Sequence, residues 1–86
     1  MQENASVLML LTKDKYILAY LCRRQKDKVL VIMNLSTHSV DFELDHPAIT
    51  GYYEDLFTQE KVEMKRRQNY SFTPGGYKLF YYTNVD

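Results

Sequence analysis

The chain has 86 residues, and its eleven Lys and Arg residues balance eleven Asp and Glu residues, so the formal net charge is zero. This balance lacks the basic excess of a nucleic-acid-binding domain, and the 45% hydrophobic content is unlike that of a disordered segment. We therefore expect one folded domain over residues 1–86, with no nucleic acid and no membrane among its partners.

No segment of the sequence predicts a membrane span or an export signal. The longest uninterrupted apolar run, residues 16–22, is far shorter than the roughly 20 residues that cross a bilayer as a helix. Residues 1–4 lack the basic and apolar regions of a secretory signal, and localisation stays undecided. The single cysteine, Cys22, excludes an internal disulfide, and its place in an apolar run predicts a buried thiol.

Short apolar segments separated by turn residues predict eight strands. In chain order they cover residues 7–11, 16–22, 29–35, 40–44, 51–57, 61–64, 68–72 and 77–82. Pro47 breaks the ladder after the fourth strand, and Gly75 and Gly76 permit a positive φ before the last one. No stretch keeps a helical period. The pattern predicts an all-β fold, an antiparallel Greek-key-type β-sandwich of about eight short strands.

The third predicted strand is apolar on both sides, whereas a strand with one wet side alternates. Val29, Val31 and Met33 point one way, and Leu30 and Ile32 point the other. Because so small a chain readily covers only one side of a sheet, the second side predicts a docking partner. The candidates for this interdomain face are Tyr16, Leu18, Tyr20, Leu30, Ile32 and Phe80. Which parity faces outward stays open, since a one-residue shift of register exchanges the sides.

The carboxylates predict no catalytic pair. Asp41, Glu43 and Asp45 alternate with an apolar stripe, so a solvated strand edge is favoured over a calcium site. Glu54 and Asp55 are neighbours in a strand and therefore point to opposite sides of the sheet. Glycoside hydrolysis needs two carboxylates facing each other across a cleft, so we expect no catalytic residue in this chain.

The remaining polar residues predict no metal site and no cofactor. His38 and His46 lie in predicted turns, and two histidines with one cysteine are too few for a closed zinc site. No serine has the glycines of a nucleophile elbow, and the Gly75-Gly76 pair precedes a strand rather than a helix, which excludes a phosphate-binding loop of the usual kind.

Four segments, in order, resemble the C-terminal β-sandwich domain of the alpha-amylase family of glycoside hydrolases. The first two match the family patterns "vlay-R" and "vlvv-NlS", and the last two match "G-y-dll" and "l-P-gy-vl". Two positions depart from the family: Gln59 stands where glycine is frequent, and Gly75 where an aromatic residue is common. The matching segments are residues 16–24, 28–36, 51–57 and 70–80.

The resemblance implies that the catalytic residues lie in another domain. In that family the catalytic carboxylates lie in a preceding TIM-type barrel, and the C-terminal sandwich packs on the side of that barrel. This chain is then expected to be a non-catalytic module that covers and stabilises the catalytic barrel of a parent enzyme acting on an alpha-glucan. The glucan, the choice between hydrolysis and transfer, and whether Met1 is the natural start stay undecided, and coding sequence upstream of Met1 would support the docking interpretation.

Two alternatives to a docking module stay open. A carbohydrate-binding module stacks sugars on surface aromatic side chains, although the absence of tryptophan counts against it. A free-standing domain that associates into a homo-oligomer through its second apolar side is the other alternative. The candidates for carbohydrate binding are Tyr52, Tyr53, Tyr70, Tyr81 and Tyr82.

Overall fold

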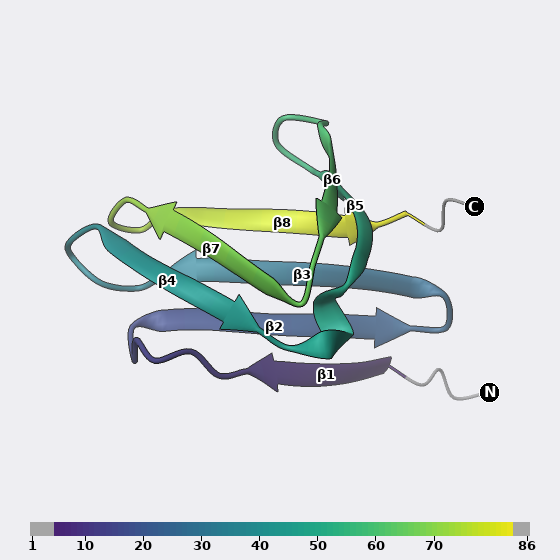
Figure 1. Cartoon of the computed structure of the whole chain (residues 1–86), viewed down its shortest axis with the longest axis horizontal. Helices are drawn as coiled ribbons and strands as arrows, with labels where there is room; N and C mark the ends of the chain where they lie inside the picture. The colour runs from purple at the N-terminus through teal and green to yellow at the C-terminus, as the bar shows by residue number, and fades with distance from the viewer. Residues whose placement is uncertain (1–4, 84–86) are drawn as a thin grey trace.

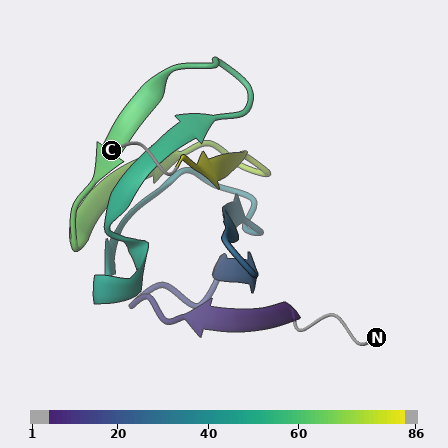
Figure 2. The ribbon, with the colours of Figure 1, turned by 90° about the vertical axis from the view of Figure 1, so that its right-hand side faces the viewer.

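The structure, a computed structural model, describes residues 5–83 as two antiparallel sheets packed against each other (Figures 1 and 2). The larger sheet has six strands in the order β1-β2-β3-β8-β5-β6, and the smaller sheet pairs β4 with β7. This arrangement confirms the predicted antiparallel β-sandwich of eight strands. Residues 1–4, which carry the prediction about an export signal, lie outside the described residues. The strands are β1 (Ala5–Leu10), β2 (Ile17–Arg24), β3 (Asp27–Asn34), β4 (Val40–Asp45), β5 (Gly51–Asp55), β6 (Lys61–Met64), β7 (Arg67–Phe72) and β8 (Tyr77–Tyr82).

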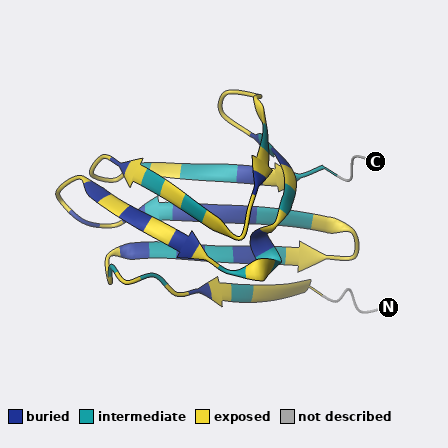
Figure 3. Cartoon of the chain, viewed as in Figure 1, coloured by how far each residue is buried: buried dark blue, intermediate teal, exposed yellow. Residues whose placement is uncertain are grey.

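The core lies between the two sheets and takes every second residue of the central strands. In β4 the predicted alternation is confirmed, because Val40, Phe42 and Leu44 are buried while the residues between them are exposed (Figure 3). The ring of Phe42 meets Phe72 of β7 edge-on, with centroids 5.3 Å apart. The larger sheet contributes the remaining strand residues of this core, namely Leu10, Ile17, Ala19, Leu21, Leu30, Ile32, Tyr53, Met64 and Phe80.

Asn34, at the end of β3, ties the two sheets together. Its side-chain amide nitrogen donates to the carbonyl oxygens of His38, Phe72 and Thr73 at 3.0, 3.2 and 3.0 Å. Its side-chain oxygen accepts from the backbone N–H and the hydroxyl of Ser36 at 2.9 and 2.8 Å. One buried side chain thereby fixes both the turn into β4 and the end of β7, which sets how the small sheet lies on the large one.

Local side-chain chemistry sets where two of the strands end. After β4, the Nδ1 atom of His46 accepts the backbone N–H of Ala48 and caps a single 3₁₀ turn, Pro47–Ile49. The fifth strand ends at Asp55 rather than at residue 57 as predicted, because the Asp55 carboxylate accepts the backbone N–H groups of Phe57 and Thr58 and turns the chain. The other predicted boundaries differ from the observed ones by two residues at most.

Candidate interdomain face

The outward side of the larger sheet is apolar over four adjacent strands. The register aligns Met9 with Tyr20, Tyr20 with Val31, and Val31 with Leu79, so outward-pointing residues of β1, β2, β3 and β8 form continuous rows. These positions alternate with core residues along each strand. We define the outer apolar face as Val7, Met9, Leu18, Tyr20, Cys22, Val29, Val31, Met33, Tyr77 and Leu79.

The margins of the outer apolar face are open to solvent, whereas its centre is covered only by its own neighbours. Val7, Met9 and Tyr77 are 60%, 51% and 55% exposed. Val31 is buried because Tyr20 and Leu79 flank it on the adjacent strands, not because another layer covers it. Contiguous exposed apolar surface of this kind is typical of an interaction site.

An exposed aromatic pair continues this surface beyond the strands. The ring of Phe57, in the turn after β5, meets the ring of Tyr77 edge-on with centroids 5.3 Å apart, and Phe57 is 53% exposed. Together with the segment 74–76 these two side chains line a shallow hollow at the start of β8. Two charged residues, Arg24 and Asp27, also lie on the outward side of these strands. They are opposite each other in the register, at the end of the sheet where β2 turns into β3.

The six residues predicted for an interdomain face fall on different sides of the sheet. Leu18 and Tyr20 belong to the outer apolar face, and Tyr16, just before β2, is 43% exposed and lies edge-on to His38. The other three, Leu30, Ile32 and Phe80, point into the core and are 0%, 0% and 3% exposed.

Strand register explains this division. Tyr20 is paired with Val31 and Leu18 with Met33, which turns Leu30 and Ile32 of β3 toward the core. Sequence reasoning therefore missed Val31, Met33 and Leu79 as residues of the outward side. The strand pairing would have identified them, but neither side of β3 is more apolar than the other.

Of the five tyrosines considered for carbohydrate binding, two are on the surface. Tyr52 and Tyr81 are 51% and 38% exposed, whereas Tyr53 is completely buried. Burial raises the pKa of both Tyr53 and Tyr70 to about 12. Tyr82 is half-buried, packs edge-on against Tyr53, and has the Lys28 amine 4.2 Å from its ring centroid. Tyr53, Tyr70 and Tyr82 are thus part of the packing between the sheets.

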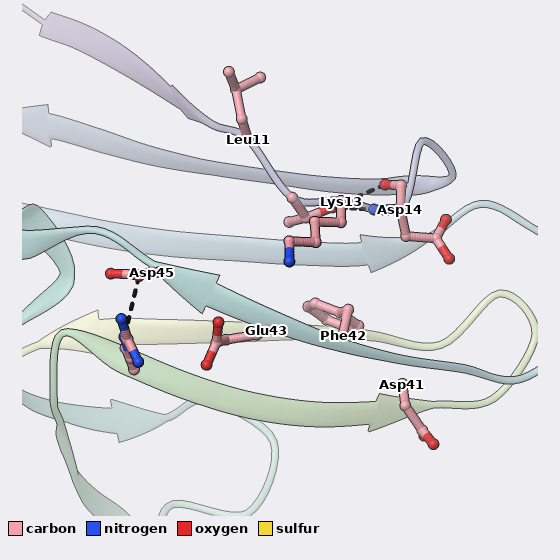
Figure 4. A pocket seen from close by; sticks show the side chains of 9 residues that line it. Leu11, Lys13, Asp14, Asp41, Phe42, Glu43 and Asp45 are labelled. Carbon is pink, nitrogen blue, oxygen red and sulfur yellow. Dashed lines mark hydrogen bonds and ion pairs between the residues drawn. The ribbon is translucent and has the colours of Figure 1, made fainter.

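An open polar groove runs along the outward edge of β4 (Figure 4). The loop residues Lys13 and Asp14 lie across it from the carboxylates of β4, and its volume is about 880 Å³. Asp45 contacts Arg66 at 2.9 Å and Arg67 at 3.2 Å, and the hydrogen bond from Arg66 is the main cause that lowers the pKa of Asp45. The groove therefore has its carboxylates on a solvated edge, as the sequence predicted.

Asp55 is the buried acid of the chain segment that the structure describes. Its carboxylate forms an ion pair with the Lys78 amine at 2.9 Å and also accepts the two backbone N–H groups of the turn. Burial alone would raise the pKa of Asp55, but these hydrogen bonds and the charge of Lys78 outweigh burial and hold the pKa below its ordinary value. Glu54 points to the opposite side of β5, as predicted.

The histidines and the cysteine are separated in the fold. His46 caps the 3₁₀ turn, His38 lies against Tyr16, and Cys22 is a half-buried free thiol on the outer apolar face. Within residues 5–83, no group of three or more His, Cys, Asp or Glu side chains is arranged to hold a metal ion. No helix in the described part of the chain is long and apolar enough to cross a membrane.

Residues 7–80 match the family model of the C-terminal domain of maltogenic amylase. The chain belongs to this family. The resemblance inferred from the four sequence segments, to the C-terminal sandwich of amylase-type glycoside hydrolases, is thereby confirmed.

Solved structures show the same fold. Eighteen chains match, among them beta-galactosidase from Bacillus circulans sp. alkalophilus, with a TM-score of 0.57 and 16% sequence identity. That similarity covers 86% of this chain and 10% of the beta-galactosidase chain, so this domain spans a small part of that enzyme. No curated protein sequence matches.

Proposed function

We propose that this domain is non-catalytic and packs on the catalytic barrel of an amylase-like glycoside hydrolase through the outer apolar face. The observation that carries the proposal is the unbroken apolar surface over β1, β2, β3 and β8 in a domain of the maltogenic amylase C-terminal family. A C-terminal domain of that family has a catalytic region as its natural neighbour. Burial of this surface then stabilises both domains.

The positions of the carboxylates support a non-catalytic role. Glycoside hydrolysis needs two carboxyl groups about 5–9 Å apart across one cleft. In the groove along β4, Asp41 accepts the Ser71 hydroxyl at 2.6 Å, and Asp45 contacts two arginines. Asp55 is buried against Lys78, and Glu54 lies on the other side of its strand. We therefore expect the purified chain to release no reducing sugar from maltotriose, and hydrolysis that disappears when one carboxylate is replaced would contradict this.

Docking is tested by mixing the 86-residue chain with the catalytic barrel of a maltogenic amylase from the same organism, produced without its own C-terminal domain. Isothermal calorimetry measures binding. Met9→Lys and Tyr77→Lys place a charge at opposite margins of the outer apolar face, on side chains more than half exposed, so both variants are expected to fold. Each should weaken binding more than tenfold, because a charge buried without a partner is costly.

The matched control places the same charge on the other side of the molecule. Asn69→Lys changes an exposed residue of β7, on the outward side of the smaller sheet, and should leave binding unchanged. Equal weakening by Asn69→Lys, or no binding by the unmodified chain, refutes docking through the outer apolar face. Analytical ultracentrifugation of the chain alone tests the remaining alternative, self-association. That alternative is supported if the chain forms a homo-oligomer, Met9→Lys disrupts it, and the chain does not bind the barrel.

A further inference from the structure

Tyr52 and Tyr81 lie together on the outward side of the larger sheet, beside the outer apolar face. Tyr81 of β8 is opposite Glu54 of β5, two residues along that strand from Tyr52. Residues in this diagonal relation on one side of a sheet are about 7 Å apart. Both rings are solvent-accessible, at 51% for Tyr52 and 38% for Tyr81, so one elongated ligand can contact both.

Free carboxylates alternate with the two rings. Glu54 is opposite Tyr81, and Glu63 of β6 is opposite Tyr52, both on the outward side. Among the described residues, neither glutamate side chain makes a hydrogen bond or an ion pair, although Lys61 of β6 lies opposite Glu54 in the register. They therefore differ from Asp41, Asp45 and Asp55, whose carboxylate oxygens already accept hydrogen bonds or form ion pairs within the chain.

The Tyr81 ring and the Tyr52 backbone are held in place before any ligand binds. The Tyr81 hydroxyl donates to the Asp27 carboxylate at 2.6 Å, which orients the ring. The backbone carbonyl of Tyr52 accepts both the N–H and the hydroxyl of Thr83, at 2.8 and 3.0 Å. A site that is rigid in the free protein loses little conformational entropy on binding.

We propose that Tyr52, Glu54, Glu63 and Tyr81, here called the tyrosine platform, bind a short linear α-glucan. The C–H face of a sugar ring packs on an aromatic ring, and sugar hydroxyls donate to carboxylates, so a surface that alternates the two groups suits a chain of sugars. The choice of an α-glucan follows from membership in a maltogenic amylase family. The site does not depend on barrel docking.

The second exposed aromatic pair lacks these polar groups. Phe57 and Tyr77 line their hollow together with Pro74, Gly75 and Gly76, and no carboxylate or amide side chain joins them. Apolar surface without hydrogen-bond partners suits a protein neighbour better than a sugar. The β5–β6 hairpin also crosses the direction of the other strands steeply (Figure 1), so a barrel on the outer apolar face would have the tyrosine platform at its margin.

The test is an NMR titration of the ¹⁵N-labelled chain with maltoheptaose. We expect amide shift changes centred on β5, β6 and the end of β8, with a dissociation constant of about 1 mM. Tyr52→Ala and Tyr81→Ala should each weaken binding at least fivefold, and Glu54→Gln about threefold, because each removes a group that contacts the sugar. If Tyr81→Ala fails to fold, the other two variants decide.

Matched controls make the assignment specific. Tyr77→Ala removes a tyrosine that is more exposed than Tyr81 and on the same side of the sheet, and should leave affinity within about twofold. Tyr81→Phe, which keeps the ring, should weaken binding less than Tyr81→Ala. The proposal is wrong if about 10 mM maltoheptaose shifts no amide, if the shifts centre on Tyr77, or if Tyr77→Ala is as harmful as Tyr81→Ala. Equal binding of cellohexaose refutes the choice of an α-glucan.

Discussion

Asn34→Asp is predicted to be among the most destabilising isosteric changes in this fold. The amide nitrogen of Asn34 donates to three backbone carbonyls, and its oxygen accepts two hydrogen bonds from Ser36. The side chain is 1% exposed. Aspartate has the same shape but no N–H group, so an ionised carboxylate would face three carbonyl oxygens in the interior.

The magnitude follows from the three hydrogen bonds lost and from the charge placed against carbonyl oxygens. Net hydrogen bonds contribute about 1 kcal/mol each, and a buried polar group that loses its partner costs about 1–3 kcal/mol. The carbonyls of His38 and Thr73 keep the Ser36 hydroxyl and the Gly76 N–H as donors, so the loss stays near the lower end, at about 4 kcal/mol. A domain of this length has a total stability of about 4–13 kcal/mol, so the loss is a large fraction of the whole.

Urea denaturation followed by circular dichroism measures this loss, and Asn69→Asp is the matched control. Asn69 is exposed on β7 and lies opposite Glu43, so the same change there adds only a solvated like-charge pair and should lower the free energy of unfolding by no more than about 1 kcal/mol. With a slope near 1 kcal/mol per molar urea, Asn34→Asp should lower the midpoint by several molar or unfold the chain outright. A midpoint within about 1 M of that of Asn69→Asp would refute the role assigned to Asn34.

Three further predictions concern the turn after β5 and the turn between β2 and β3. Gln59 has a φ of 65°, a left-handed conformation that is strained for residues with a Cβ atom, so Gln59→Gly should raise the free energy of unfolding by about 0.5–1 kcal/mol in urea titrations. Gln25→Gly, at a φ of 57°, should do the same, and destabilisation by both would contradict the argument. The lowered pKa of Asp55 adds stability that is fully present above its ordinary value of 3.8 and is lost as pH falls through the folded-state pKa. The stability advantage of the unmodified chain over Asp55→Asn should therefore shrink in acid, and a difference constant from pH 7 to about pH 3 would refute it.

Local patterns in the sequence predicted the strands well, because each strand is short and is bounded by its own turn chemistry. The alternation of Val40, Phe42 and Leu44 with acidic residues correctly oriented β4, since one side was clearly polar. The same reasoning could not orient β3, where both sides are apolar and only the pairing with β2 distinguishes Leu30 from Val31. Orientation thus depended on contacts distant in sequence, which a local pattern does not contain.

The tyrosines show the same limit at the candidate sugar site. Tyr52 and Tyr53 are adjacent in β5, yet one is half exposed and the other fully buried. Sequence composition treats them alike, and all five candidates were equivalent until the register placed Tyr52 and Tyr81 on one side. The importance of Asn34 was also hidden, because its partners His38, Phe72 and Thr73 come together only when the two sheets pack.

The outer apolar face also sets how much stability the proposed docking could add to this domain. Interfaces between domains of one chain bury about 600–1,500 Å², and apolar burial contributes about 25 cal/mol per Å². Even the smaller area gives a gross gain of about 15 kcal/mol before the costs of ordering and desolvation, which equals or exceeds the total stability of a domain this size. On the outward side, Val31 of β3 is already buried laterally by Tyr20 and Leu79, so another layer would chiefly cover the exposed margins, Val7, Met9 and Tyr77. If the domain docks as proposed, the interface would add stability comparable to that of the isolated fold, and burial on both sides would account for the two-sided apolar strand.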